Sequence, residues 1–416
     1  MKPNDRLAKA NLLLLLGASV WASPVTTVPW NGHKGAVTFT FDDGCPTQLT
    51  NVLPALKARG QTATFFLIGN SAFTGKQAEW KAAALAGHEL GNHTTLHDQL
   101  NSLDSAKITA EIRDQALALR AVDPAVEAVT LAYPYCGTND LVNRIANREN
   151  IIARTCGGDG LFAWNSKPTE WMSMTSFILQ DDASVPAALT QIDKAAADNS
   201  WLVTLNHGIG GDWNYIGTAQ AISMFDRAVA AKVWVSTYQN VAAYWRASKT
   251  MDTVTARQTS TGWDLAWTSP HPRMPRSVRL RIKLDTATFG STAQLGQNGT
   301  PIARESDGSY VIDFMKLALS VSRTSSRSPR NHQETRPSIV RTSNHGDLRI
   351  DGIDDGLYSC AFVKADGSRS AEAIVLARGR SATIATADIT GRTSMLELRS
   401  SANPADHWLF RLPSVR

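Results

Sequence analysis

Between residues 36 and 248 the apolar positions follow two alternating patterns. Short runs that are apolar at nearly every position predict strands buried on both faces, and longer segments with apolar residues every three or four positions predict amphipathic helices. The predicted strands lie at 36–41, 62–69, 128–134, 150–155, 201–208 and 233–237, and the predicted helices at 49–60, 76–87, 103–122, 140–148, 185–199, 218–232 and 240–248. Repeated strand–helix units predict an α/β fold, and this many units favour a closed or nearly closed, distorted (β/α) barrel.

The pattern changes after about residue 250. Several later segments alternate between apolar and polar residues with period two and have no long helix between them, which predicts a C-terminal β-rich, sandwich-like region. These segments lie at 277–284, 308–314, 356–363, 372–379 and 394–400. Residues 320–346 are rich in Ser, Arg and Pro, a composition typical of a solvated loop or linker. We therefore expect a catalytic domain over 30–250 and an accessory β-rich region over 251–416.

The first 22 residues have the layout of a secretory signal peptide. Three basic residues precede an apolar run of about a dozen residues, which is shorter than the roughly 20 needed to span a bilayer. Val20 and Ala22 are small residues at suitable cleavage positions. An uncleaved anchor or a buried helix is the alternative. The layout favours a secreted or cell-envelope protein with no membrane span once the signal is removed.

Composition narrows the class further. The chain of 416 residues is 43% hydrophobic and 19% charged, which is typical of a globular protein, and its net charge of +5 does not indicate nucleic-acid binding. Its four cysteines are too few for a disulfide-dense scaffold but permit bridges in an exported chain. Cys136 and Cys156 form the first candidate pair, and buried free thiols are the alternative.

Acidic and imidazole side chains follow the ends of several predicted strands. Asp42 and Asp43 end the first strand, His93 and His97 follow another, and His207 ends a third. The carboxyl ends of parallel barrel strands share one face, where active sites collect. Two adjacent carboxylates oppose each other's ionisation, and a cation offsets that cost. We expect one aspartate and the two histidines to bind Zn²⁺ or another divalent transition metal such as Co²⁺, with a position left open for water.

Four ordered motifs resemble those of the polysaccharide deacetylases, carbohydrate esterase family four. They are "TFTFDDG", "HELGNHTTLH", "LAYPYCG" and "LVTLNHG", and they lie between residues 38 and 208, about two fifths of the chain. The resemblance implies metal-assisted hydrolysis of an acetyl group from an acetylated polysaccharide. Chitin oligomers, peptidoglycan, an exopolysaccharide and xylan all suit it, and amide and ester cleavage both stay open.

The resemblance also implies a role for each motif residue. Asp42 matches the general base, Asp43, His93 and His97 the metal ligands, and His207 the general acid. Tyr135 matches the residue whose backbone N–H stabilises the oxyanion. Two further residues are expected to bind substrate: Leu205 as an apolar wall of the acetyl pocket, where core packing is the alternative, and Trp213, which follows the fourth motif, as a stacking surface for a sugar ring.

The chain departs from the family pattern at three places. Many members have an arginine that orients the base where this chain has Ala132, which leaves the partner of Asp42 unidentified. Cys136 stands where glycine is usual. The motif that supplies neighbours of His207 is not clear, and Trp164, Trp171 and Asp181 are its candidates. Two alternatives to an enzyme follow: a catalytically inactive carbohydrate-binding protein on a deacetylase scaffold, or a structural wall protein. Measurement of acetate release would distinguish an enzyme from both of these alternatives.

Overall fold

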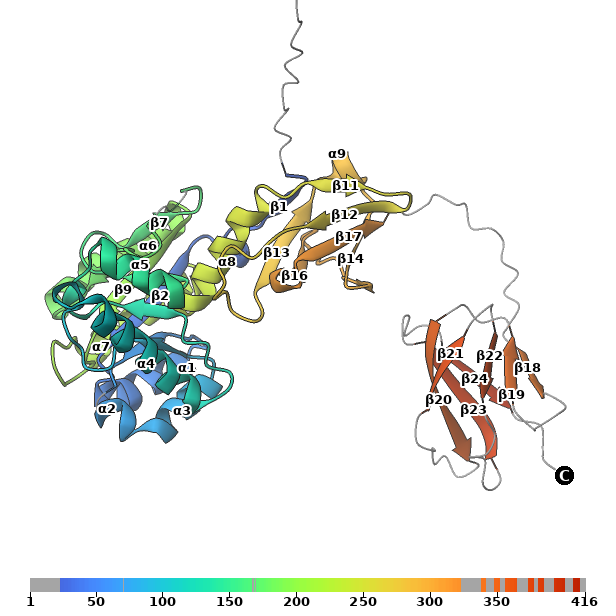
Figure 1. The fold of residues 1–416 in the computed structure, drawn as a ribbon, viewed down its shortest axis with the longest axis horizontal. Coiled ribbons are helices and arrows are strands. Elements are labelled where there is room, and N and C mark those ends of the chain that lie inside the picture. The colour runs from blue at the N-terminus through green and yellow to red at the C-terminus, as the bar shows by residue number, and fades with distance from the viewer. Residues whose placement is uncertain are drawn as a thin grey trace, which may run out of the picture. The chain divides into compact units, whose positions relative to one another are not determined.

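The computed structural model describes residues 23–322, except residues 70, 167 and 169, and a set of strands between 338 and 411. The chain divides into two compact units, Met1–Thr324 and Ser325–Arg416 (Figure 1). This division falls within the segment 320–346 that the composition marks as a loop, most of which lies outside the described residues. The predicted signal peptide also lies outside them. The predicted domain boundary at residue 250 stays a prediction.

A curled, mostly parallel sheet forms the centre of the first unit. The main path of this sheet has the order β6-β5-β4-β3-β2-β9-β7, and β8 and β10 add to β9 and β2. The strands are β2 Ala36–Asp42, β3 Thr64–Leu67, β4 Glu89–Asn92, β5 Thr130–Ala132, β6 Ile152–Arg154, β7 Leu161–Ala163, β8 Phe177–Ile178, β9 Ser200–Asn206 and β10 Trp234–Val235. All neighbours pair in parallel except β7, which is antiparallel to β9. The predicted parallel α/β sheet is therefore confirmed.

An irregular segment that begins near Trp171 bonds first to β6 and then to β9, which are far apart in the sheet order. The backbone of Ala153 in β6 exchanges hydrogen bonds with Trp171 and Met174 at 2.9 and 3.1 Å. A few residues later the same segment forms β8, which pairs with β9. The sheet thus curls through short, distorted pairings, which agrees with a distorted barrel.

All of the helices around the sheet except the short α2 lie where the 3.6-residue pattern predicts them. The helices are α1 Leu53–Lys57, α2 Ser71–Thr74, α3 Gln77–Leu85, α4 Ser105–Val122, α5 Asp140–Glu149, α6 Val185–Ala197, α7 Thr218–Ala230 and α8 Tyr238–Met251. Side chains that accept backbone N–H groups fix several starts: Asp104 caps α4, Asn139 caps α5 and Thr237 caps α8. A π-helical turn, Gln48–Val52, leads into α1.

Alternation along β2 decides which side chains face the interior of the curled sheet. Phe39 and Phe41 belong to the apolar cluster shared with the outer helices. The intervening positions Thr38, Thr40 and Asp42 therefore face the concave side, because successive side chains in a strand point to opposite faces. That inner side is filled mainly by residues of α8 and by Trp201.

The β-rich segment after α8 lies beside that helix (Figure 1). Its apolar side chains share one cluster with the barrel. Its strands are β11 Ala256–Gln258, β12 Gly262–Ala266, β13 Arg279–Leu284, β14 Gln294–Gln297, β15 Thr300–Pro301, β16 Tyr310–Asp313 and β17 Ala318–Ser322, with a short α9 Thr286–Phe289. The N-terminal strand β1 Val25–Thr27 pairs with β13 in antiparallel register. One apolar cluster runs from the inner face of the sheet through α8 to β13 and β16.

The second unit holds two antiparallel sheets. Their orders are β18-β19-β22 and β21-β20-β23-β24. The strands are β18 Ser338–Arg341, β19 Leu348–Asp351, β20 Gly356–Lys364, β21 Ala373–Ala377, β22 Ser381–Ile384, β23 Thr393–Ser400 and β24 His407–Arg411. A sandwich-like packing of these sheets stays a prediction. Among the helices that the structure describes, none has the length and apolar composition to cross a membrane.

Candidate active site

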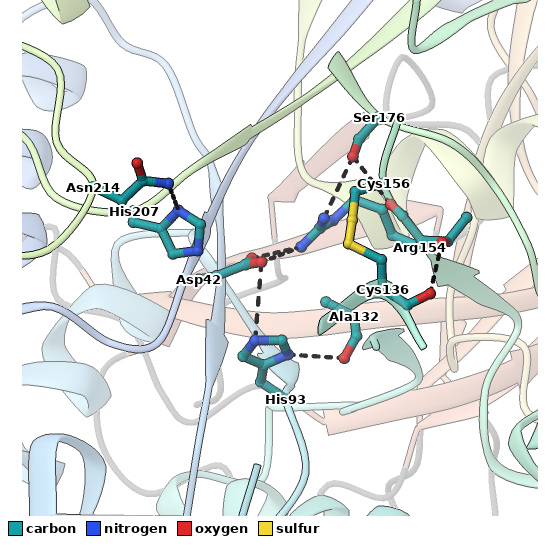
Figure 2. Close-up of a disulfide and its surroundings, with 10 residues drawn as sticks. Asp42, His93, Ala132, Cys136, Arg154, Cys156, Ser176, His207 and Asn214 are labelled. Carbon is teal, nitrogen blue, oxygen red and sulfur yellow. Dashed lines mark hydrogen bonds and ion pairs between the residues drawn. A yellow bond between two sulfur atoms is a disulfide. The ribbon is translucent and has the colours of Figure 1, made fainter. Parts of the chain in front are cut away.

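The acids and imidazoles identified in the sequence meet at the carboxyl ends of three parallel strands. Asp42 is the last residue of β2 and Asp43 follows it, His93 follows β4, and His207 follows β9. Figure 2 shows Asp42, His93 and His207 converging from these separate elements. The structure thus brings together residues that lie up to 165 positions apart, as the barrel prediction requires.

Asp43, His93 and His97 form a cluster that could hold a metal ion. Their potential ligand atoms all lie within 4.8 Å of one another. Asp43 Oδ1 lies 3.4 Å from His93 Nε2 and 3.6 Å from His97 Nε2. The two histidines do not lie on a helix, because His97 sits in a turn with φ of 62°. The segment 93–97 therefore brings the two imidazoles together without a helix.

Two observations indicate that this cluster fits a cation. Asp43 Oδ1 is buried and has no hydrogen-bond partner among the described residues, so a positive ligand there would satisfy an otherwise costly group. His93 Nδ1 lies 2.8 Å from the carbonyl oxygen of Ala132. Donation to that carbonyl leaves Nε2 as the lone-pair nitrogen facing Asp43, an arrangement typical of metal-ligating histidines. One carboxylate and two imidazoles suit Zn²⁺ and related transition metals.

Electrostatic interactions and burial shift the pKa values of the residues in this cluster. Burial raises the pKa of Asp43, but His93, His207 and His97 outweigh burial and leave that pKa lowered. Burial lowers the pKa of His97, and the neighbouring His93 lowers it further. The carboxylate is therefore ionised and His97 neutral near pH 7, which are the forms that bind metal. Burial lowers the pKa of His93, but Asp42 and Asp43 outweigh burial and leave that pKa raised, so metal binding there releases a proton.

A buried arginine is the partner of Asp42. Arg154 Nη2 lies 2.6 Å from both carboxylate oxygens of Asp42, and the two residues are 2% and 4% exposed. The guanidinium also lies over the ring of Phe66, 5.2 Å from its centroid. A charge pair this deeply buried fixes the carboxylate in place. Arg154 is therefore the partner of Asp42 that the presence of Ala132 left unidentified in the sequence.

The strand register explains why an arginine at position 154 can take the role expected of an arginine at position 132. Ala132 at the end of β5 and Arg154 at the end of β6 are Cα partners in neighbouring parallel strands. The two positions therefore share a face of the sheet at the same height. Gly91 on β4 leaves room for the Phe66 ring under the guanidinium, since an added Cβ there would collide with that ring. Sequence analysis missed Arg154, although the strand "NIIART" contains it.

His207 is held by residues that the sequence did not single out. Asn214 Nδ2 lies 3.4 Å from His207 Nδ1, and donation from the amide places the ring proton on Nε2, the nitrogen 3.9 Å from Asp43 Oδ2. Buried Gln48 donates through Nε2 to the backbone carbonyls of Asp42 and His207, at 2.6 and 3.2 Å. Burial lowers the pKa of His207 and outweighs the opposing effect of Asp42 and Asp43.

The three sequence candidates for neighbours of His207 serve other parts of the fold. Asp181 accepts the backbone N–H of Ser184 and so caps a short 3-10 helix, Asp182–Ser184. Trp171 packs edge-on against Trp245 of α8, and the carbonyl of Trp164 accepts the indole N–H of Trp245. These residues stabilise the capped turn and the packing around α8, and Asn214 takes the place beside His207.

The predicted substrate-binding residues differ in exposure. Tyr135 and Trp213 are 67% and 64% exposed, and their rings lie 4.7 Å from His97 and 4.5 Å from His207, centroid to centroid. Exposed aromatic rings therefore lie beside two histidines of the site, His97 and His207. Leu205 is buried in β9 beside Thr40 and Ile178, so core packing is a sufficient reason for it. The roles of Tyr135, Leu205 and Trp213 stay predictions.

A disulfide joins two loops of the site (Figure 2). Cys136 and Cys156 are bonded, with their Cα atoms 5.4 Å apart, so the candidate pair is confirmed. Cys45 is a buried free thiol, and Cys360 is buried in β20. Burial and the nearby carboxylates of Asp43, Asp212 and Asp42 raise the pKa of Cys45 to about 12, so it stays a thiol and is a poor metal ligand.

Comparison with known proteins agrees with this geometry. Residues 31–151 match the family model described as polysaccharide deacetylase. The chain is 28% identical over 250 residues to a chitin deacetylase of Pestalotiopsis sp., covering 56% of this chain and 76% of that protein. It is 29% identical over 154 residues to a peptidoglycan-N-acetylglucosamine deacetylase of Bacillus cereus, covering 36% and 67%. The resemblance read from the motifs is therefore confirmed.

A further relative and a solved structure cover smaller shares. A chitooligosaccharide deacetylase of Sinorhizobium fredii is 29% identical over 148 residues, which span 35% of this chain and 64% of the relative. A family 4 carbohydrate esterase from Streptomyces lividans, solved in complex with acetate, matches with a TM-score of 0.35 and 21% identity, covering 48% of this chain and 88% of the esterase.

Proposed function

We propose that this chain, a member of the polysaccharide deacetylase family through its barrel, is an exported metal-dependent hydrolase that removes acetyl groups from a polysaccharide. The observation that carries the proposal is the convergence of Asp42, Asp43, His93, His97 and His207 at one end of the barrel. The buried, unpartnered Asp43 Oδ1 at the centre of that group supports a metal-dependent reaction.

The proposed chemistry uses each group for one task. A divalent cation held by Asp43, His93 and His97 would polarise the acetyl carbonyl and lower the pKa of the attacking water. Asp42, held by Arg154, takes a proton from that water as general base. The backbone N–H of Tyr135 stabilises the negative charge that develops on the carbonyl oxygen.

His207 completes the reaction as general acid. Its Nε2 faces the cluster, and the contact with Asn214 favours the tautomer with the proton on Nε2. From there the imidazole gives a proton to the leaving nitrogen or oxygen of the sugar. Since Gln48 joins the backbones of Asp42 and His207, the base and the acid are held at a fixed separation.

The surroundings of the site favour a polymeric, N-acetylated sugar. The curated relatives include deacetylases named for chitin, chitooligosaccharide and peptidoglycan, whose acetyl groups are attached through nitrogen. The exposed rings of Tyr135 and Trp213, beside His97 and His207, suit sugar rings that extend beyond the acetylated unit. The disulfide supports export, because such bonds persist in oxidising compartments.

Acetate release tests the proposal directly. The mature protein is incubated with chitin oligomers, peptidoglycan and acetylated xylan, each with added Zn²⁺ or Co²⁺ and again after chelation. We expect chelator-sensitive acetate release from at least one N-acetylated substrate. Glycan binding without acetate release, with the metal bound, would instead identify a carbohydrate-binding protein on a deacetylase scaffold.

A further inference from the structure

The disulfide joins two segments that carry different groups of the proposed active site, the oxyanion donor and the partner of the base. Cys136 directly follows Tyr135, whose backbone N–H is the proposed oxyanion donor, and Cys156 lies two residues after Arg154, which holds the base. Figure 2 shows the bond beside the Arg154–Asp42 pair. No other covalent link joins the turn 133–137 to the end of β6 among the described residues.

The backbone at this turn is unfavourable without external support. Tyr135 and Cys136 have φ of 52° and 60°, in the left-handed region that favours glycine. Two consecutive non-glycine residues in this region persist only where the surroundings hold them. Glycine would adopt the conformation at position 136 without strain, so the cysteine is there at a conformational cost that its bond can offset.

Hydrogen bonds hold the two segments together on the inner side of the disulfide. The Tyr133 N–H donates to the carbonyl of Arg154 at 3.0 Å, and Thr155 Oγ1 donates to the carbonyl of Cys136 at 3.1 Å. Beyond the end of the strand pairing, the disulfide adds a covalent link at Cys136, the residue that follows Tyr135. Both cysteines are only partly buried, so a reductant can reach them.

We propose that the Cys136–Cys156 disulfide is a positioning link that holds the oxyanion turn of Tyr135 against the end of β6 that carries Arg154. This inference rests on the proposed deacetylase function for its catalytic consequence. The link does not touch the metal ligands, which follow β2 and β4. Its loss therefore lowers kcat while metal content changes little.

Two variants separate positioning from simple stabilisation. C136S/C156S removes the bond and keeps a side chain at the left-handed position, and C136G/C156S removes the bond and relieves that strain. Because a displacement of about 1 Å at a reacting group can cost a factor of 100, we expect kcat of the serine variant to fall at least tenfold. We expect the glycine variant to recover part of that loss, with unchanged metal content in both.

Reduction of the folded wild-type protein gives the same test without mutation. A water-soluble phosphine reduces the bond: the phosphorus takes the oxygen of one water molecule, and the two protons of that water convert the sulfurs to thiols. We expect the reduced wild type to lose activity to the level of C136S/C156S, and the phosphine to leave that variant unchanged. Near-ultraviolet circular dichroism checks that the reduced protein stays folded.

Hydrogen–deuterium exchange tests the link independently of turnover. We expect the amides of residues 133–137 to exchange at least tenfold faster in C136S/C156S, with the amides of β2 and β3 unchanged. Unchanged exchange in the turn, or a kcat equal to the wild type, would overturn the inference. A loss of metal content or of global stability that accounts for the whole fall in kcat would also overturn it. If the oxidised wild type releases no acetate from any substrate, the proposed function fails, and the exchange result still decides whether the link orders the turn.

Discussion

Arg154 and Asp42 contact each other at 2.6 Å although four steps in the sheet order separate their strands. Adjacent strands lie about 4.8 Å apart, so a flat sheet would place β2 and β6 roughly 19 Å from each other. The curl of the sheet turns both side chains into the same interior. The ion pair is therefore a consequence of the barrel-like curvature.

Replacing Arg154 should damage both stability and turnover. Arg154→Met leaves the buried Asp42 carboxylate without its partner, which costs about 3–5 kcal/mol of unfolding free energy. Arg154→Lys keeps a positive charge and should retain more of both properties. Urea unfolding and kcat measure the two effects. Arg113→Met removes an exposed arginine that pairs with Asp114 and serves as the control with nearly unchanged stability. Equal stability of Arg154→Met and the wild type would contradict the assigned role.

Variants of the metal ligands and a variant of the base should differ in whether they still bind metal. Asp43→Ala and His97→Ala each remove one of three ligands, so bound Zn²⁺ should be lost together with activity. Asp42→Asn removes the proton acceptor but leaves the three ligands, so it should bind metal and turn over at least 100-fold more slowly. Elemental analysis and acetate release measure the two properties. Full turnover by a metal-free wild-type sample would refute the metal-dependent mechanism.

Trp213 should contribute to binding of extended substrates. Its ring is 64% exposed and lies edge-on to His207, where it can stack on a neighbouring sugar. Loss of one aromatic contact of about 1 kcal/mol raises KM about fivefold. We expect Trp213→Ala to show this rise for an acetylated oligosaccharide and a smaller one for a single acetylated sugar. Leu85→Ala, which removes an equally exposed apolar side chain at the end of α3, should leave KM unchanged.

Buried His88 should make the fold less stable in acid. Burial lowers the pKa of His88 to about 4, from an ordinary value of 6.5, and its Nδ1 accepts the N–H of Ala63. Its contribution to stability is complete above pH 6.5 and is lost as the pH falls from 6.5 towards 4, because the unfolded chain binds the proton more tightly. The shift corresponds to about 3 kcal/mol at pH 4.

A non-titrating variant isolates that contribution. Asn at position 88 can accept the same N–H through its side-chain oxygen but does not bind a proton in this range. Between pH 7 and pH 4.5 we expect the wild type to lose about 2–3 kcal/mol more unfolding free energy than His88→Asn, measured by urea unfolding. The other acid-titrating groups are common to both proteins and cancel. Parallel losses in the two proteins would show that His88 is not responsible.

The local sequence alone determined the elements and most of the candidate chemistry. The two periods of apolar residues predicted β2, β3, β5, β6, β9 and β10 and most of the long helices, because buried strands and amphipathic helices impose those patterns directly. The four-residue strand β4 was not predicted. The acids after β2 and the imidazoles after β4 and β9 were found from strand order, since parallel strands place their carboxyl ends on one edge. Short strands such as β7, β8 and β1 were missed because two or three residues carry no periodic signal.

The contacts that tune the site depended on the tertiary structure. Arg154 is an ordinary residue at the end of a short strand in the sequence, and only the β5–β6 register and the curl of the sheet identify it as the partner of Asp42. Asn214 and Gln48 reach His207 from a loop and a π-helical turn, which no sequence pattern marks. The sequence determines which groups can do the chemistry, because their type and strand position are local properties. Their protonation and orientation were decided by the curled sheet, because both depend on neighbours that lie far apart along the chain.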